Sequence, residues 1–234
     1  MTKNLFKESF CLKETVCTII SDRQQGIQAA AESIRHSRRE LEVYGKANPK
    51  FLYTLKPHPP PEKPTVAKLM AEAAAKAGVG PMAAVAGAIA DLAVAEMGRA
   101  GCEVAIVEDG GEISAVSKVP VDVAVAAGDE PLSRRFGFRL TDFPVGVATS
   151  SGRFSHALSF GDAEAATVFC RNACLADAVA TAVGNVVKGL DTDAAVKAGI
   201  EQGMSVEGVD GVMIIYRGKV GMAGKIPEII KVDS

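Results

Sequence analysis

Asp177 and Thr181 stand four residues apart in the alanine-rich stretch 172–187, NACLADAVATAVGNVV, whose remaining residues are typical of a buried helix. Residues four apart share one face of a helix, so the carboxylate and the hydroxyl converge. Such oxygen ligands suit a hard cation such as Mg²⁺, which takes its remaining ligands from water and phosphate. The residues alone also permit a structural alternative, in which backbone donors satisfy the aspartate and the threonine bonds the carbonyl one turn back.

Two glycine-containing segments offer backbone that a ligand can approach closely. The sequence EDGGE over 108–112 predicts a hairpin turn, which by itself explains both glycines. The segment 146–156, GVATSSGRFSH, concentrates hydroxyls and a glycine after a predicted strand, which suits phosphate or ribityl contacts. His156 is a candidate general acid or base, the alternative being an ordinary loop or strand histidine.

Composition bounds the class of protein. The 234 residues are 48% hydrophobic and 23% charged, as in a well-folded globular chain, and the net charge of −2 gives no basic field for nucleic acid. The N-terminal residues have no apolar signal region, and no run of about 18 apolar residues lacks charges, so neither export nor membrane spanning is predicted. We expect a cytoplasmic protein. No hydrolase triad spacing, G-x-G-x-x-G or Walker sequence is present.

The first part of the chain predicts mainly helices. A strand over 10–21 precedes a long helix with Asp22 as its N-cap, and a helix capped by Thr65 runs to about 77. Between them, the proline-rich segment 47–64 cannot be helix or central strand, and its apolar anchors predict a strap packed on the surface. Pro81 then opens an apolar helix, which is buried either inside the chain or against a second copy in a homodimer.

Strands dominate the middle of the chain. The hairpin around Gly110 is followed by short strands, then by the helix that carries Asp177, a helix over 191–202 and a hairpin turning at 217–219. This order favours an α+β fold with antiparallel sheets over a doubly wound parallel sheet. The short strands are predicted at 121–127, 136–141, 145–150, 155–160 and 164–170.

Set in order, these segments resemble the ApbE-like family, the FAD:protein FMN transferases, and in particular its short cytoplasmic branch. The sequence ACLADAVATAV over 173–183 resembles the family's metal-binding helix, A-x-x-x-A-D-A-L-A-T-A. The sequence VAGAIADLA over 85–93 is similar to its A-K-G-Y-A-V-D helix. VAIVEDGGEISA stands where the family has a strand ending in N-x-G-G-D, and ATSSGRFSH resembles its A-T-S-G segment joined to its S-H-I-I-D-P strand.

This resemblance implies one two-lobed, T-fold-like α+β domain over 1–234, with antiparallel sheets packed against helices and the strap at 47–64. It also implies FAD binding between the lobes, Mg²⁺ on the pyrophosphate and transfer of the FMN moiety to a hydroxyl of an acceptor protein. The metal ligands would be Asp177, Thr181 and a backbone carbonyl near Val85, and His156 would be the catalytic residue. The implied flavin-binding residues are Gly87, Asp91, Gly110, Gly111, Glu112, Thr149, Ser150, Ser151 and Gly152.

The chain departs from the family pattern at three places. Ala86 replaces the lysine of A-K-G, Glu112 replaces the aspartate of G-G-D, and ALSFGDAEA over 157–165 replaces the D-P-x-T-G segment. The sequence therefore leaves three functions open. They are a Mg²⁺-dependent enzyme that transfers FMN or cleaves the FAD pyrophosphate, a module that binds a flavin or another dinucleotide without transfer, and an interaction protein on a vestigial scaffold.

Overall fold

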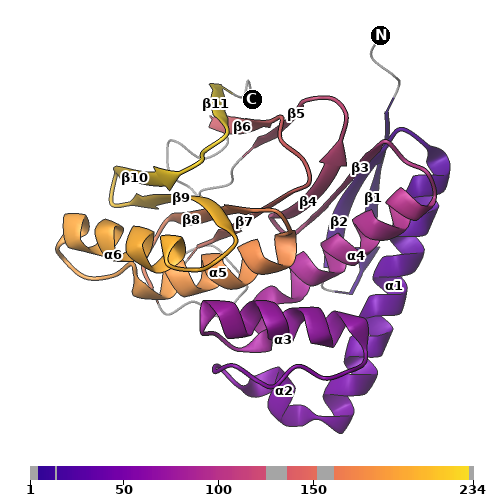
Figure 1. Cartoon of the computed structure of the whole chain (residues 1–234), viewed down its shortest axis with the longest axis horizontal. Helices are drawn as coiled ribbons and strands as arrows, with labels where there is room; N and C mark the ends of the chain where they lie inside the picture. Colours follow the sequence, from indigo (N-terminus) through magenta and orange to yellow (C-terminus); the bar gives the residue numbers. More distant parts are fainter. Residues whose placement is uncertain (1–4, 14, 125–135, 152–160, 232–234) are drawn as a thin grey trace.

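The computed structural model describes residues 5–13, 15–124, 136–151 and 161–231. Its large sheet has eight strands in the order β1-β2-β3-β4-β7-β8-β9-β10, and its small sheet has the order β11-β6-β5. Every pair of neighbouring strands is antiparallel. The helices lie on one side of the large sheet and the small sheet on the other (Figure 1). The predicted α+β class with antiparallel sheets is confirmed.

The elements have the following bounds. The strands are β1 (Phe6–Leu12), β2 (Thr15–Ser21), β3 (Val104–Asp109), β4 (Glu112–Ser117), β5 (Val121–Ala124), β6 (Phe136–Leu140), β7 (Val145–Ser150), β8 (Ala165–Cys170), β9 (Val209–Tyr216), β10 (Lys219–Gly224) and β11 (Glu228–Lys231). The helices are α1 (Gln24–Ala47), α2 (Pro49–Tyr53), α3 (Thr65–Ala77), the 3₁₀ helix η1 (Pro81–Ala84), α4 (Val85–Arg99), α5 (Ala173–Val186) and α6 (Thr192–Met204).

The beginning of the chain corrects two predictions. Instead of one strand over 10–21, β1 and β2 form a hairpin that turns near Lys13, whose φ is 54°. The N-cap of α1 is Arg23 rather than Asp22, and the carboxylate of Asp22 accepts hydrogen bonds from the amides of Glu103 and Val104, each at 3.0 Å. Those bonds join the start of α1 to the start of β3 and involve residues about eighty positions apart, which no local pattern in the sequence reveals.

The strap at 47–64 is packed as predicted, but part of it is helical. Pro49 occupies the first position of α2, where a helix tolerates proline because that amide has no intrahelical acceptor. Phe51 is fully buried, with its ring against the edges of Tyr44 and His58. The exclusion of helix from this segment was therefore wrong. Tyr53 is 79% exposed, so it is no anchor of the strap.

Two hydrophobic cores flank the large sheet. The larger core lies between the large sheet and the helices, and the smaller one lies between the other face of the large sheet and the small sheet. In the smaller core the ring centroids of Phe138 and Phe169 are 4.8 Å apart. β11 forms one edge of the small sheet by pairing with β6, and the sequence patterns did not indicate this strand. The predicted strand at 155–160 lies outside the described residues.

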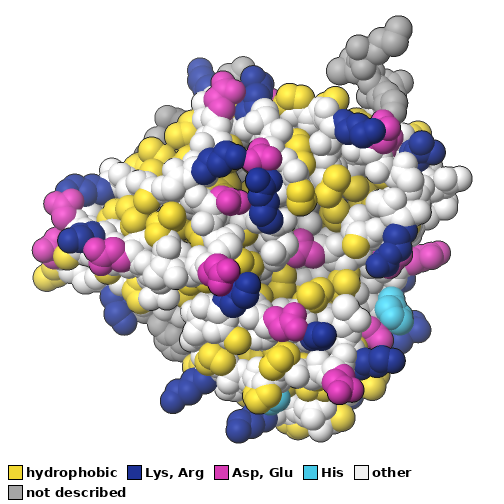
Figure 2. Space-filling view, in the orientation of Figure 1, with side chains coloured by type: hydrophobic (Ala, Val, Ile, Leu, Met, Phe, Trp, Pro, Cys, Tyr) yellow, Lys and Arg dark blue, Asp and Glu magenta, His cyan; other side chains and the backbone are white. Residues whose placement is uncertain are grey.

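The segment Pro81–Arg99, which comprises η1 and α4, is long and apolar enough to cross a membrane by length and composition alone. A buried helix inside a folded chain passes the same test, and half of this segment is buried. It packs against α1, α5 and the strands β3 and β4, so the prediction of a helix wrapped by other elements is confirmed. On the face shown in Figure 2, acidic and basic side chains are interspersed among the described residues rather than gathered by sign.

Candidate functional site

Asp177 projects from α5 onto the first turn of α4. Its Oδ2 accepts a hydrogen bond from the Gly87 amide at 3.0 Å, and the Ala86 amide contributes as well. The first amides of a helix lack intrahelical acceptors, and α4 has no side-chain cap of its own. The half-buried aspartate therefore has backbone partners, as the structural alternative predicted. These bonds do not exclude a cation on the same carboxylate, which has further lone pairs.

Two more carboxyl groups lie near Asp177. Asp109 and Glu112 face each other across the hairpin turn, as the last residue of β3 and the first of β4. Burial, together with the neighbouring charges of Asp177 and Asp109, raises the pKa of Glu112 well above its ordinary value. Burial is also the main cause that raises the pKa of Asp177 to about 7, and the charges of Asp109 and Asp91 add to it. A cation here would relieve the repulsion among these carboxylates.

Val85 and Thr181 line the same cavity, which has a volume of about 460 Å³. Thr181 follows Asp177 by one helical turn on the same face of α5, and Val85 is the first residue of α4. Two of the residues predicted as metal ligands thus share one cavity wall, while Asp177 lies outside this lining and bonds to the Gly87 amide, two residues after Val85. The rest of the wall is mainly apolar and comes from the strap, the connection between α3 and η1, η1 itself and α5: Leu52, Tyr53, Thr54, Leu55, Val79, Gly80, Met82, Ala83 and Asn185.

The predicted ligands are of the type that hard cations bind. Among the described residues, no three His, Cys, Asp or Glu side chains come together so that they could hold a metal ion by themselves. A carboxylate, a hydroxyl and a backbone carbonyl are hard oxygen donors, the type that Mg²⁺ binds while it keeps several water or phosphate ligands. The site therefore suits a magnesium ion that arrives with a phosphate group.

The glycine turn opens onto a different cavity. Gly110 and Gly111 have φ values of 69° and 117°, and with Thr149 they line a cavity of about 400 Å³. Ile113 of β4 belongs to the core under the small sheet, whereas Ser114 bonds to α4. Because successive residues of a strand face opposite sides, this cavity lies on the small-sheet face, while Glu112 faces the helices.

The remaining residues predicted from the 146–156 segment are only partly described. Ser150 ends β7, and Ser151 follows it as a buried residue. Thr149 shares a hydrogen bond of 3.0 Å with the hydroxyl of Thr167 on β8. Gly152 and His156 lie outside the described residues, so the proposed contact and the proposed proton transfer stay predictions.

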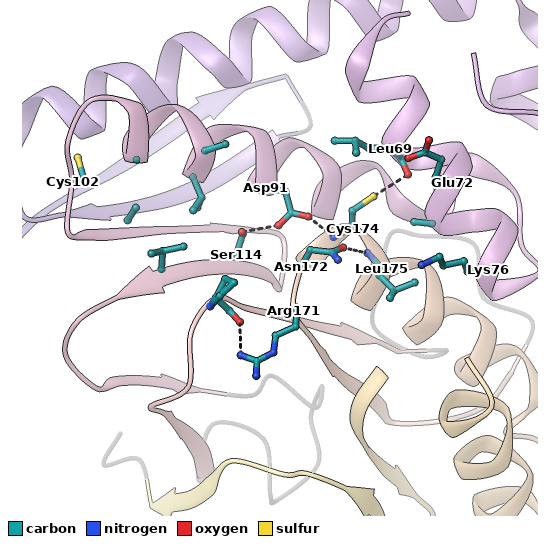
Figure 3. A pocket seen from close by; sticks show the side chains of 17 residues that line it. Leu69, Glu72, Lys76, Asp91, Cys102, Ser114, Arg171, Asn172, Cys174 and Leu175 are labelled. Carbon is teal, nitrogen blue, oxygen red and sulfur yellow. Dashed lines mark hydrogen bonds between the residues drawn. The ribbon is translucent and has the colours of Figure 1, made fainter. Parts of the chain in front are cut away.

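Asp91 lies apart from both of these cavities and lines a third, of about 580 Å³ (Figure 3). Its carboxylate accepts bonds from the Ser114 hydroxyl at 2.7 Å and from the amides of Ala173 and Cys174, each at 2.9 Å. These partners tie α4 to β4 and to the first turn of α5. They give Asp91 a structural role, and its predicted contact with a flavin stays a prediction.

The residues that sequence reasoning missed belong to the strap. Tyr53 and Leu55 are exposed side chains in the wall of the cavity that holds Val85 and Thr181. Their only signal was apolar side chains between prolines, which predicted packing on the surface rather than a ligand wall. Their position beside Thr181 depends on how α2 and η1 meet α5, which is a property of the folded chain.

The raised pKa of Asp177 predicts a pH dependence of stability in the metal-free protein. Its folded value of about 7 exceeds the ordinary 3.8, so the folded chain binds this proton more tightly than the unfolded chain. The resulting stabilisation is complete below about pH 4 and is lost as pH rises toward 7. With EDTA present, we expect the Tm to fall by several degrees between pH 5 and pH 8, and to fall less in Asp177→Asn. A Tm with the same slope in both proteins would contradict this assignment.

Comparisons with known proteins agree with this architecture. The family model described as AbpE bacteria matches residues 10–221. A UPF0280 protein of Methanosarcina acetivorans is 41% identical over 230 residues, which cover 97% of this chain and 90% of that protein. A UPF0280 protein of Methanocaldococcus jannaschii is 36% identical over 233 residues, which cover 97% and 94%.

Two solved structures share the fold at low sequence identity. The apo form of the flavinyl transferase ApbE of Pseudomonas stutzeri superposes with a TM-score of 0.62 and 13% identity, over 94% of each chain. The ApbE protein of Thermotoga maritima gives a TM-score of 0.60 and 14% identity, over 94% of this chain and 97% of that one. The chain therefore belongs to the AbpE bacteria family, together with the UPF0280 proteins that it matches over nearly its full length, and it has an ApbE-like α+β fold.

Proposed function

We propose that this protein binds FAD with Mg²⁺ and transfers the FMN moiety to a hydroxyl of an acceptor protein. The observation that carries the proposal is the meeting of Val85 and Thr181 on one cavity, one helical turn from the half-buried carboxylate of Asp177. The fold shared with flavin transferases supports the choice of ligand. Asp177, Thr181 and the Val85 carbonyl would hold the cation, which neutralises charge on the phosphates when it is bound.

The cavity wall suits the flat rings of a dinucleotide. Leu52, Leu55 and Met82 provide apolar surface, and Tyr53 provides an aromatic face at the rim. Ligand sites of this size are mostly apolar with a few polar groups that set the orientation. Asn185, one turn beyond Thr181, offers an amide for such a contact.

In the proposed transfer, the acceptor's hydroxyl oxygen forms a bond to the FMN phosphorus while the pyrophosphate P–O bond breaks and AMP leaves. The hydroxyl proton must go to a base, for which the resemblance supplies His156. Burial favours the protonated form of Glu112, so it can retain a proton close to Asp177. A protonated Glu112 thus adds no negative charge beside the phosphates of the bound FAD.

A second candidate function is FAD binding without transfer. It is favoured by the replacement of the family's D-P-x-T-G segment by ALSFGDAEA over 157–165 and of its lysine by Ala86. The ligands at Asp177 and Thr181 would then serve retention or delivery of the flavin. An interaction protein on a vestigial scaffold would bind no nucleotide at all.

Thermal unfolding with FAD, FMN, ADP and ATP separates these functions, each ligand with Mg²⁺ and with EDTA. For FAD at about 100 times its Kd with Mg²⁺, we expect roughly 2.7 kcal/mol of added stability. Release of AMP from FAD, followed by chromatography, then indicates transfer or hydrolysis rather than retention. No shift with any nucleotide would contradict both binding functions.

A further inference from the structure

Helices α4 and α5 cap each other. Asp91 of α4 accepts the first two amides of α5, from Ala173 and Cys174, and Asp177 of α5 accepts the Gly87 amide in the first turn of α4. Each carboxylate satisfies orphan donors of the opposite helix, and each lies near the positive end of that helix's dipole. The pair of bonds to Asp91 and the single bond to Asp177 lie one helical turn apart on both helices.

We propose that Asp91 is a positioning residue for the Asp177 site rather than a ligand contact. The three predicted metal ligands come from both helices, because Val85 begins α4 while Asp177 and Thr181 lie on α5. Their relative placement therefore depends on what fixes the first turn of α5 against α4. Asp91 does this directly, and the inference rests on the proposed function only where it refers to the cation.

The surroundings of Asp91 support this role over direct binding. One oxygen accepts both the Ser114 hydroxyl and the Ala173 amide, and the other accepts the Cys174 amide. Figure 3 shows the bonds of Asp91 with Ser114 and Cys174. The cavity that Asp91 lines is separate from the one that holds Val85 and Thr181. Asp91 thus acts on the candidate site indirectly, by holding the backbone of the first turn of α5.

Asn172 offers a matched control on the same helix end. Its Oδ1 accepts the Leu175 amide at 2.8 Å, so it caps α5 without any bond to α4. Asn172→Ala therefore removes a cap of α5, which commonly costs about 1 kcal/mol, while the tie between the helices stays. In Asp91→Asn, by contrast, an NH₂ group replaces one carboxylate oxygen and cannot accept an amide proton.

The experiment compares the Kd of FAD at fixed Mg²⁺ in the two variants and the parent, well below each Tm. We expect Asp91→Asn to weaken binding by about 10- to 100-fold, as loss of a supporting partner of a metal ligand typically does, and Asn172→Ala to stay within about twofold of the parent. If Asp91→Asn only lowers the Tm and leaves the Kd unchanged, the proposal is overturned. If Asp91→Asn does not fold, Asp91→Glu keeps the charge but displaces it by one methylene, and the same comparison applies.

Hydrogen exchange of the Gly87 amide tests the proposal without any ligand. Its acceptor is Asp177, so its protection reports whether the Asp177 carboxylate stays in place. We expect protection of Gly87 to fall about tenfold in Asp91→Asn but not in Asn172→Ala. Loss of protection confined to Ala173 and Cys174 would overturn the positioning role. Absence of FAD binding in the parent would contradict the proposed function, while this exchange result would still decide the role of Asp91.

Discussion

Replacement of Asp177 by alanine should abolish the Mg²⁺-dependent stabilisation by FAD. The variant loses the only carboxylate among the three predicted metal ligands, and a hydroxyl with a carbonyl is a poor site for a divalent cation. The expected result is no Tm shift with FAD and Mg²⁺, where the parent gains roughly 2.7 kcal/mol at about 100 times its Kd. Calorimetric titration of FAD at fixed Mg²⁺ should show the same loss directly.

Asp177→Ala should still fold in the absence of Mg²⁺. At neutral pH the parent carries the cost of a partly desolvated carboxyl whose pKa is raised to about 7, and alanine removes that cost. The Gly87 amide loses its acceptor in return, which commonly costs about 1–3 kcal/mol. Asp191→Ala is the control, since Asp191 caps α6 through the Ala194 amide and lies on no cavity that the predicted site residues line. An unchanged Kd in Asp177→Ala would rule out the metal assignment.

Local patterns in the sequence predicted much of the fold. The helix predicted within 172–187 is α5, which begins at Ala173, because periodicity is a property of neighbouring residues. The glycine turn after Asp109 is also where the pattern placed it. β11 was missed, because four residues at a sheet edge carry too little alternation to be recognised alone.

The candidate site could be predicted only in part. The spacing of Asp177 and Thr181 showed that they share a helical face, but the backbone amides that bond to Asp177 and Asp91 lie 82 to 90 positions away in the chain. The motifs also gave no sign that Thr149 faces one side of the large sheet while Thr181 lies on the other. Which face a residue occupies depends on strand register and layer order, and these follow from packing of the whole chain.

Gly87, in the VAGAIADLA segment over 85–93, is a glycine because of packing between helices rather than because of contact with a ligand. A Cβ on Gly87 would lie 2.3 Å from the carbonyl oxygen of Ala173 and 2.8 Å from the Cα of Cys174. Both atoms are backbone, so no side chain can rotate to make room. The glycine therefore permits the close approach of α4 and α5 on which the mutual capping depends.

Gly87→Ala should accordingly destabilise the protein, although alanine is the better helix former by about 1 kcal/mol. Overpacking against backbone atoms typically costs about 1–3 kcal/mol, and since the contact here is with backbone we expect a net loss of about 1–2 kcal/mol in urea unfolding. Gly98→Ala on the same helix is the matched control, because no described atom beyond its own helical turn lies within 4 Å of the place that its new methyl group would take. It should leave stability unchanged or raise it by up to about 1 kcal/mol. Equal stability of the two variants would show that α4 and α5 can separate without loss, and that their contact does not hold the site together.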